Sequence, residues 1–328
     1  MIQIKFTQFV GTGNDLLSEP SGIAQLSHPD GRFVIVNDTN AQKALFVAEM
    51  GGNGKLHSKK LDFPDSPELD DLEGVALSGD WIYVISSHSA VDDDDSKARR
   101  IARFQIRGDS VSELQDARGA EHLKKRVKRA LEAKHPQLED EDFADEEFNI
   151  EGFASQDDEF LVGLRSPIVD GKAMVVRTYG LQGAYGIEPG KYGVFASSVP
   201  LDLKKGGIRS LSYIPDLGGY LIVSGKTVSG QEEFPCDLST TRSVSKFLLW
   251  FWDGEERCMQ VSCFDLEQDG VRIQPEGISP ATVDKRQTIC IVSDDGDEDN
   301  QIPGRYSLLP ETQYQELKDL IRQSSKSG

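Results

Sequence analysis

A short pattern recurs five times along this chain, and it constrains the fold more than any other feature. Each copy opens with a polar or charged residue, continues as an apolar run, turns, and ends in a second apolar run closed by polar residues. In the second copy these two runs are Leu72–Ala76 and Trp81–His88. The opening positions of the five copies are Ser21, Glu73, Glu151, Arg209 and Glu276.

Self-similarity of this kind predicts a repeat architecture, and two further strand-like segments after each copy indicate the four-stranded blades of a β-propeller. The fifth copy has only one such segment, Tyr306–Leu309, so the alternating N-terminal run Ile2–Val10 is expected to supply its outer strand. The residues after Glu276 together with those before Ser21 are enough for one closing blade. We therefore predict an all-β, five-bladed propeller, a single domain over residues 1–328, with six blades as the alternative.

Two segments depart from the strand pattern. Leu123, Val127 and Leu131 recur every four residues between lysines and arginines, which predicts an amphipathic helix inserted between blades two and three. An acidic run follows it, so that the whole insertion spans 116–147. Residues 311–323 predict a C-terminal helix. The insertion either pairs its own charges or docks a protein partner, and the sequence leaves both interpretations open.

The charge balance excludes some partners. A net charge of −19 and a pI near 4.7 argue against nucleic-acid binding. Because no apolar run approaches the length of a membrane span and no leader pattern opens the chain, we expect no membrane association. The chain has four cysteines, Cys236, Cys258, Cys263 and Cys290. Four do not make a disulfide framework in a chain of this length, so we expect free thiols and a cytoplasmic protein. We also expect the protein to be a monomer.

Several motifs of known chemistry are missing from the sequence. It contains no glycine-rich phosphate loop, no His-Glu-x-x-His and no Gly-x-Ser-x-Gly elbow, so no catalytic residue is assigned. The acidic runs Asp92–Asp95 and Asp295–Asp299 are interpreted as solvated loops, with an irregular calcium site as the alternative.

The most informative polar residues are those that open the first strand of each blade and those that close the second. Both sets are expected to face the central channel near the same end. Charged residues bury poorly alone, so these side chains must meet one another, a metal or a ligand. The closing positions are Asp38, His88, Arg165, Lys226 and Asp294-Asp295.

Three interpretations of this ring remain open. In the first, Glu73, Glu151 and Glu276 are neutralised by the cations Arg165, Arg209 and Lys226. In the second, the same three glutamates hold Ca²⁺ or Mg²⁺ as metal ligands. In the third, an anion-binding or catalytic pocket is lined by Arg165, Arg209, Lys226, His88 and Asp294. All three place Arg165 and Arg209 at the same channel mouth as the glutamates.

A set of short segments resembles a bacterial family of single-chain propellers of unknown function, with Arg165-Ser-Pro and Glu276-Gly as its more specific motifs. The set is Leu72–Ala76, Gly163–Pro167, Gly207–Leu211, Leu249–Gly254, Pro275–Ile278 and Val292–Gly296. More remotely, the Glu-Gly strand openers are similar to those of phytase-like esterase, gluconolactonase and paraoxonase propellers. Those families hold a divalent cation at the axis and hydrolyse esters or lactones, which implies Glu73, Glu151 and Glu276 as ligands. The chain departs from them in Arg209 and in lacking a sixth blade.

Two functions of different classes follow. In one, the charged axial pocket binds a divalent cation, a small anionic ligand or both, and hydrolyses an ester, lactone or phosphoester. In the other, the propeller is a catalytically inactive scaffold that docks a partner through the 116–147 insertion. The sequence does not decide whether the protein is an enzyme.

Overall fold

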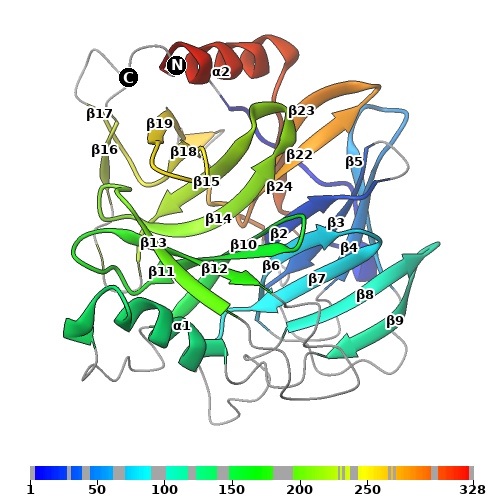
Figure 1. Cartoon of the computed structure of the whole chain (residues 1–328). Helices are drawn as coiled ribbons and strands as arrows, with labels where there is room; N and C mark the ends of the chain where they lie inside the picture. The colour runs from blue at the N-terminus through cyan, green and yellow to red at the C-terminus, as the bar shows by residue number, and fades with distance from the viewer. Residues whose placement is uncertain are drawn as a thin grey trace.

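The computed structural model describes most of the chain. The described residues are 4–27, 31–38, 45–61, 71–89, 101–116, 123–138, 148–179, 195–227, 230, 233–236, 243–264, 267–268, 271–296 and 302–324. They contain five four-stranded antiparallel sheets arranged as the blades of a β-propeller (Figure 1). The five-bladed fold predicted from the repeat is therefore confirmed.

Each of the first three blades is continuous in sequence. Blade one comprises β2 (Pro20–Gln25), β3 (Arg32–Asn37), β4 (Leu45–Met50) and β5 (Leu56–Lys60). Blade two comprises β6 (Leu72–Ser78), β7 (Trp81–Ser86), β8 (Ile101–Arg107) and β9 (Ser110–Asp116). Blade three comprises β10 (Asn149–Gln156), β11 (Glu159–Ser166), β12 (Ala173–Tyr179) and β13 (Phe195–Leu201).

Blade four is interrupted by a hairpin, and blade five is completed by the other end of the chain. Blade four comprises β14 (Gly207–Ile214), β15 (Gly219–Gly225), β18 (Leu248–Trp252) and β19 (Cys258–Cys263), with β16 (Phe234–Cys236) and β17 (Ser243–Ser245) as the hairpin. A second hairpin, β20 (Glu267–Gln268) with β21 (Val271–Arg272), precedes blade five. Blade five comprises β22 (Pro275–Val283), β23 (Arg286–Ser293), β24 (Arg305–Leu308) and β1 (Thr7–Gln8).

The N-terminal strand closes the ring as the sequence predicted. Thr7 pairs with Tyr306 and Gln8 with Arg305, so β1 is the outer strand of blade five. Phe9 is buried beside Tyr306, with ring centroids 4.9 Å apart, and its amide donates to the carbonyl of Gly304. Joining both ends of the chain in one sheet leaves no free edge at the closure.

The two helices lie at opposite ends of the molecule (Figure 1). α1 (Leu123–Glu132) belongs to the connection between blades two and three, and α2 (Glu311–Ser324) follows β24. Tyr314 and Lys318 of α2 both bind Asp216, which lies in the turn between β14 and β15. In every blade the first strand begins, and the second ends, at the end opposite this turn, which we call the site end.

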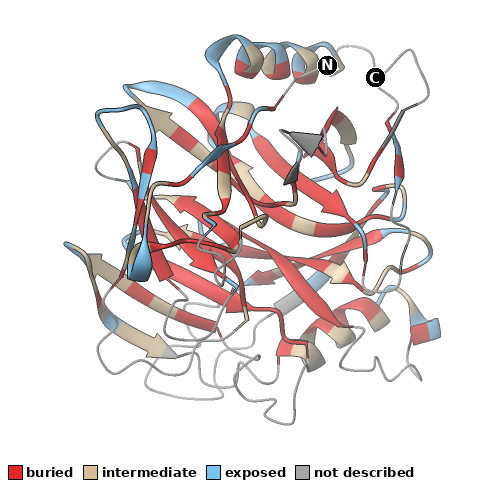
Figure 2. Ribbon diagram, turned by 180° about the vertical axis from the view of Figure 1, so that it is seen from behind, coloured by how far each residue is buried: buried red, intermediate tan, exposed pale blue. Residues whose placement is uncertain are grey.

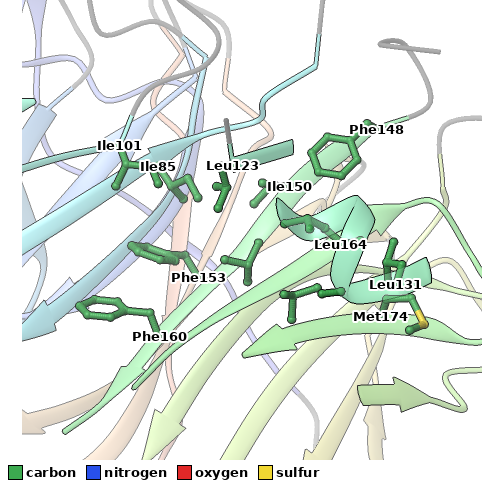
Figure 3. Close-up of a cluster of buried hydrophobic side chains, with 14 of the residues drawn as sticks. Ile85, Ile101, Leu123, Leu131, Phe148, Ile150, Phe153, Phe160, Leu164 and Met174 are labelled. Atoms are coloured by element: carbon green, nitrogen blue, oxygen red, sulfur yellow. The ribbon is translucent and has the colours of Figure 1, made fainter. Parts of the chain in front are cut away.

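α1 is packed on its own propeller. Leu123 and Leu131 are buried against Phe148 and Ile150, in the apolar layer between blades two and three (Figure 3). The Ser198 hydroxyl donates to the Ala130 carbonyl and ties the helix to β13. The acidic run that follows, 139–147, lies outside the described residues. The apolar face of α1 is thus covered by the chain itself.

One cysteine prediction was wrong. Cys236 of β16 and Cys263 of β19 form a disulfide across a separation of 27 residues, and only Cys258 and Cys290 are free. The hairpin β16–β17 folds back onto the outer strand of blade four, a tertiary contact that the spacing of the cysteines did not reveal. The argument for a cytoplasmic protein rested on four free thiols and loses that basis.

In the described part of the chain, no helix combines the length and apolar character needed to cross a membrane.

The inner strands pack closely against one another and are buried along most of their length (Figure 2). Glycine follows four of the five opening residues because a side chain there would meet the next blade. A Cβ added at Gly74 would lie 2.5 Å from Phe153 Cβ and 2.9 Å from Ile85 Cγ2. In blade four Ser210 takes this place, and its hydroxyl accepts a hydrogen bond from the Ile278 amide of blade five.

This close approach predicts the effect of adding one methyl group. Gly74→Ala is expected to destabilise the protein by about 1–3 kcal/mol, because overpacking forces the two strands apart. Gly52→Ala is the control, since a Cβ at Gly52 would have no atom within 4 Å. Urea denaturation measures both, and equal free energies of unfolding for the two variants would contradict the packing argument.

Candidate functional site

The five opening residues share one backbone feature that the sequence did not show. In every inner strand the ladder skips the opening residue: Leu72 pairs with Ser86 and Gly74 with Ile85, so Glu73 has no partner across the strand. The same register shift occurs at Ser21, Glu151, Arg209 and Glu276. A β-bulge bends the strand and re-aims the side chain of its extra residue. Five equivalent bulges therefore present five opening residues at the site end.

Four predicted residues form one ion-pair network across blades three, four and five. Arg209 Nε lies 3.0 Å from Glu151 Oε2, and Arg209 Nη1 donates to Glu151 Oε1 at 3.1 Å. Arg209 Nη2 pairs with Glu276. Arg165 Nη1 reaches Glu151 Oε1 at 2.7 Å, so Glu151 accepts from both guanidiniums. Two of the three predicted metal ligands are thus neutralised by arginine.

Glu73 stands outside this network. Its side chain is buried, with 8% of the residue exposed, and within the described residues it makes no hydrogen bond or ion pair. Carboxylate oxygens of Asp38, Asp71 and Glu73 all lie within 4.8 Å of one another. Burial raises the pKa of Glu73 well above its usual value, and the charges of Glu151, Asp38 and Asp71 raise it further while Arg209 lowers it. This carboxylate needs a proton or a cation.

The remaining predicted residues surround the same mouth in different ways. Lys226 is exposed, and its backbone carbonyl accepts a hydrogen bond from Arg165 Nε at 3.2 Å. His88 is fully buried in the left-handed backbone region, with φ of 57°. Burial and the neighbouring charge of Asp38 raise the pKa of Asp294 to about 6, against the lowering effect of Arg209. Asp295 forms an ion pair with Arg305.

Sequence reasoning missed Asp71 and the serine that contacts it, Ser87. Asp71 precedes the second repeat by one residue and adopts φ of 55°, and Ser87 donates a hydrogen bond to its Oδ2. The only available signal was the run of small polar residues after β7. The acidic run Asp92–Asp95 lies outside the described residues, as does 297–299 of the loop at Asp295–Asp299. The interpretation of both runs as solvated loops, with a cation site as the alternative, therefore stays a prediction.

Comparisons with known proteins add little to this geometry. No protein-family model matches the chain, and no protein of curated function does either. Among solved structures it is similar to Myxococcus xanthus glutaminyl cyclase, with 10% identity, 94% of each chain covered and a TM-score of 0.43. It is also similar to Bombyx mori GH32 β-fructofuranosidase BmSUC1, with 9% identity, 93% of this chain and 61% of that chain covered, and a TM-score of 0.46.

A third similar structure is MPT-4, a mannose phosphorylase from Leishmania mexicana in complex with phosphate ion. Identity is 13%, 97% of this chain and 91% of that chain are covered, and the TM-score is 0.44. Similarities of this size carry no argument about the site or the activity. The family resemblances drawn from the sequence stay predictions, and the propeller fold is established by the strand pairing.

The arginine network predicts a graded loss of stability. Arg209→Ala leaves Glu151 and Glu276 buried beside a missing guanidinium, which is expected to cost on the order of 3–5 kcal/mol. Arg165→Ala should cost less, because its side chain is 25% exposed. Arg286→Ala is the control: its pair with Glu311 is exposed and should contribute under about 1 kcal/mol. Chemical denaturation measures the order, and an Arg209→Ala variant as stable as the control would contradict the network.

The raised pKa of Glu73 predicts an unusual pH dependence. An acid whose pKa is higher in the folded state binds more protons there than in the unfolded state, so stability falls as pH rises through that range. In EDTA, the parent protein should lose stability as pH rises above the range in which an ordinary glutamate ionises, and Glu73→Gln should flatten this fall. The exposed Glu256→Gln is the control. Thermal melting across pH checks the prediction, and parallel profiles for the parent and Glu73→Gln would contradict it.

Proposed function

We propose that the protein binds a divalent cation at the junction of blades one and two, through Asp38, Asp71 and Glu73. The observation that carries this proposal is the nine-tenths-buried carboxylate of Glu73, which pairs with no other described residue and lies within 4.8 Å of two other carboxylates. A buried carboxylate is costly unless a cation or a proton compensates it. Carboxylate oxygens are the ligands that Ca²⁺ and Mg²⁺ prefer.

The charges at the other blade junctions support this position. At the next junction the residues just before His88 and Glu151 are in contact, since the Ile150 amide donates to the Ser87 carbonyl. At the following ones, Glu151 bridges Arg165 and Arg209, and Arg209 pairs with Glu276. At the junction of blades one and two, the closing residue Asp38 and the opening residue Glu73 are both acids. A cation there would join two blades at a junction whose closing and opening residues are both acids.

The same charges favour one class of substrate. All three nitrogens of Arg209 are engaged by Glu151 and Glu276, and Arg165 is engaged by Glu151 and the Lys226 carbonyl. These guanidiniums are therefore poorly placed to bind an anion. A divalent cation can polarise a carbonyl oxygen as a Lewis acid. We extend the proposal to hydrolysis of uncharged esters or lactones, in preference to phosphoesters.

Isothermal titration of the EDTA-treated protein with Ca²⁺ and with Mg²⁺ tests the binding site. We expect saturable binding by the parent and a rise in melting temperature, because a ligand that binds only the folded state stabilises it. Glu73→Gln should lose this binding while its melting temperature in EDTA stays at or above that of the parent. Glu256→Gln should behave as the parent does.

Two outcomes would overturn the proposal. One is a parent protein that binds neither cation, and the other is Glu73→Gln retaining the parent affinity. Hydrolysis is tested separately with p-nitrophenyl acetate and δ-valerolactone. Turnover that EDTA leaves unchanged, or that survives in Glu73→Gln, would refute the hydrolytic extension without affecting the binding site.

The scaffold hypothesis gains no specific support from the described residues. The apolar face of α1 is buried in the layer between blades two and three, and Lys128 pairs with Glu132 on the same helix at 3.7 Å. Within the described part of the insertion, a partner would meet only the charged face of α1. Cation binding is therefore the function that the geometry favours.

A further inference from the structure

We propose that Ser87 determines which divalent cation the site prefers, by holding Asp71 so that this carboxylate offers a cation one oxygen rather than two. The proposal rests on the cation site proposed above. Ser87 is a positioning residue, since it acts on the site through Asp71. It lies directly after β7, fully buried, in the run of small polar residues that closes the second repeat.

The direction of the hydrogen bond from Ser87 follows from the capacity of its hydroxyl group. A serine hydroxyl has one hydrogen to donate and two lone pairs to accept with. The Ser89 amide donates to Ser87 Oγ at 3.0 Å, and the Ser89 hydroxyl lies 2.7 Å from the same atom. With Ser89 donating twice, the single hydrogen of Ser87 is directed to Asp71 Oδ2. Ser89, Ser87 and Asp71 thus form a one-way chain of hydrogen bonds, in which each bond strengthens the next.

The backbone holds both ends of this contact. The Ser87 amide donates to the Asp71 carbonyl at 3.0 Å, and the Ser87 carbonyl accepts from the Ile150 amide of blade three at 2.8 Å. Asp71 itself is fixed in the left-handed region, with φ of 55°. The carboxylate is therefore tied at its backbone and at one oxygen, and it cannot rotate freely toward a cation.

A carboxylate held in this way favours coordination through its other oxygen. Partners of metal-binding side chains commonly orient them and tune the site. One-oxygen coordination keeps the ligand number low, which suits the octahedral shell of Mg²⁺, whereas Ca²⁺ accepts six to eight ligands and readily takes a carboxylate through both oxygens. Removing the Ser87 hydroxyl removes this hydrogen bond from Asp71 Oδ2, and the site should then favour the larger ion.

The experiment is a pair of titrations, with Mg²⁺ and with Ca²⁺, on the parent, Ser87→Ala and Ser87→Cys. We expect Ser87→Ala to lower Mg²⁺ affinity about tenfold or more, because removal of a residue that orients a metal ligand typically has an effect of that size. Ca²⁺ affinity should fall less or rise. The side chain in Ser87→Cys has nearly the same size as serine but is a weak hydrogen-bond donor. This variant should shift the ratio of the two affinities in the same direction, and it replaces Ser87→Ala in the test if the alanine variant does not fold.

Ser245→Ala is the matched control. Ser245 is also buried and its hydroxyl has the carbonyls of Phe247 and Phe264 within hydrogen-bond distance as acceptors for its one hydrogen, but it lies in the blade-four hairpin and outside the carboxylate group. Its ratio of Mg²⁺ to Ca²⁺ affinity should equal that of the parent. If Ser87→Ala and Ser87→Cys weaken both ions equally, or leave both unchanged, the proposal is refuted while the cation site stands. If the parent binds neither ion, both proposals fall.

Discussion

The pairing of Arg209 with Glu151 and Glu276 is the interaction on which the site end of this propeller depends. One guanidinium joins the inner strands of blades three, four and five, and Arg165 adds a second cation to Glu151. Charged side chains can be buried at a channel mouth only when such partners compensate them. The pairing accounts for two of the three axial glutamates and leaves Glu73 on the other side of the ring, among acids.

The backbone makes this arrangement possible. A β-bulge at each opening residue turns its side chain away from the regular strand alternation, and the small residue that follows lets neighbouring inner strands approach. The same local device therefore serves opposite charges: it places glutamate in three blades, arginine in one and serine in another. Ser21, the uncharged member, donates to the Leu72 carbonyl and joins blade one to blade two without any charge.

The uneven distribution of charge gives the mouth two distinct sides. On one side, arginines and glutamates neutralise each other and hold three blades together. On the other, Asp38, Asp71 and Glu73 repel one another, and Asp294 has a raised pKa for a related reason. A proton, or the cation proposed above, would offset this repulsion. Such local instability within a rigid scaffold is common at binding sites.

Much of the fold could be predicted from the sequence, because each blade repeats one pattern of apolar runs and turns that local residue preferences already define. The five blades and the closing N-terminal strand follow from that pattern, whereas the two helices follow from the segments that depart from it and carry helical signals instead. The meeting of Arg165 and Arg209 with Glu151 and Glu276 also follows from the repeat, since equivalent positions of a repeat gather at one end of the ring.

Other features depended on contacts between segments far apart in the chain, and only the tertiary structure decided them. The disulfide forms because a hairpin folds back onto β19. Which glutamate remains without an arginine depends on which side chains the bulges bring within reach. Asp71 joins the carboxylate group of Asp38 and Glu73 because Ser87 holds its side chain. Ser87 directly follows β7, the strand that pairs with β6. Residue type and spacing specify the ring, but distances between side chains specify how its charges are divided.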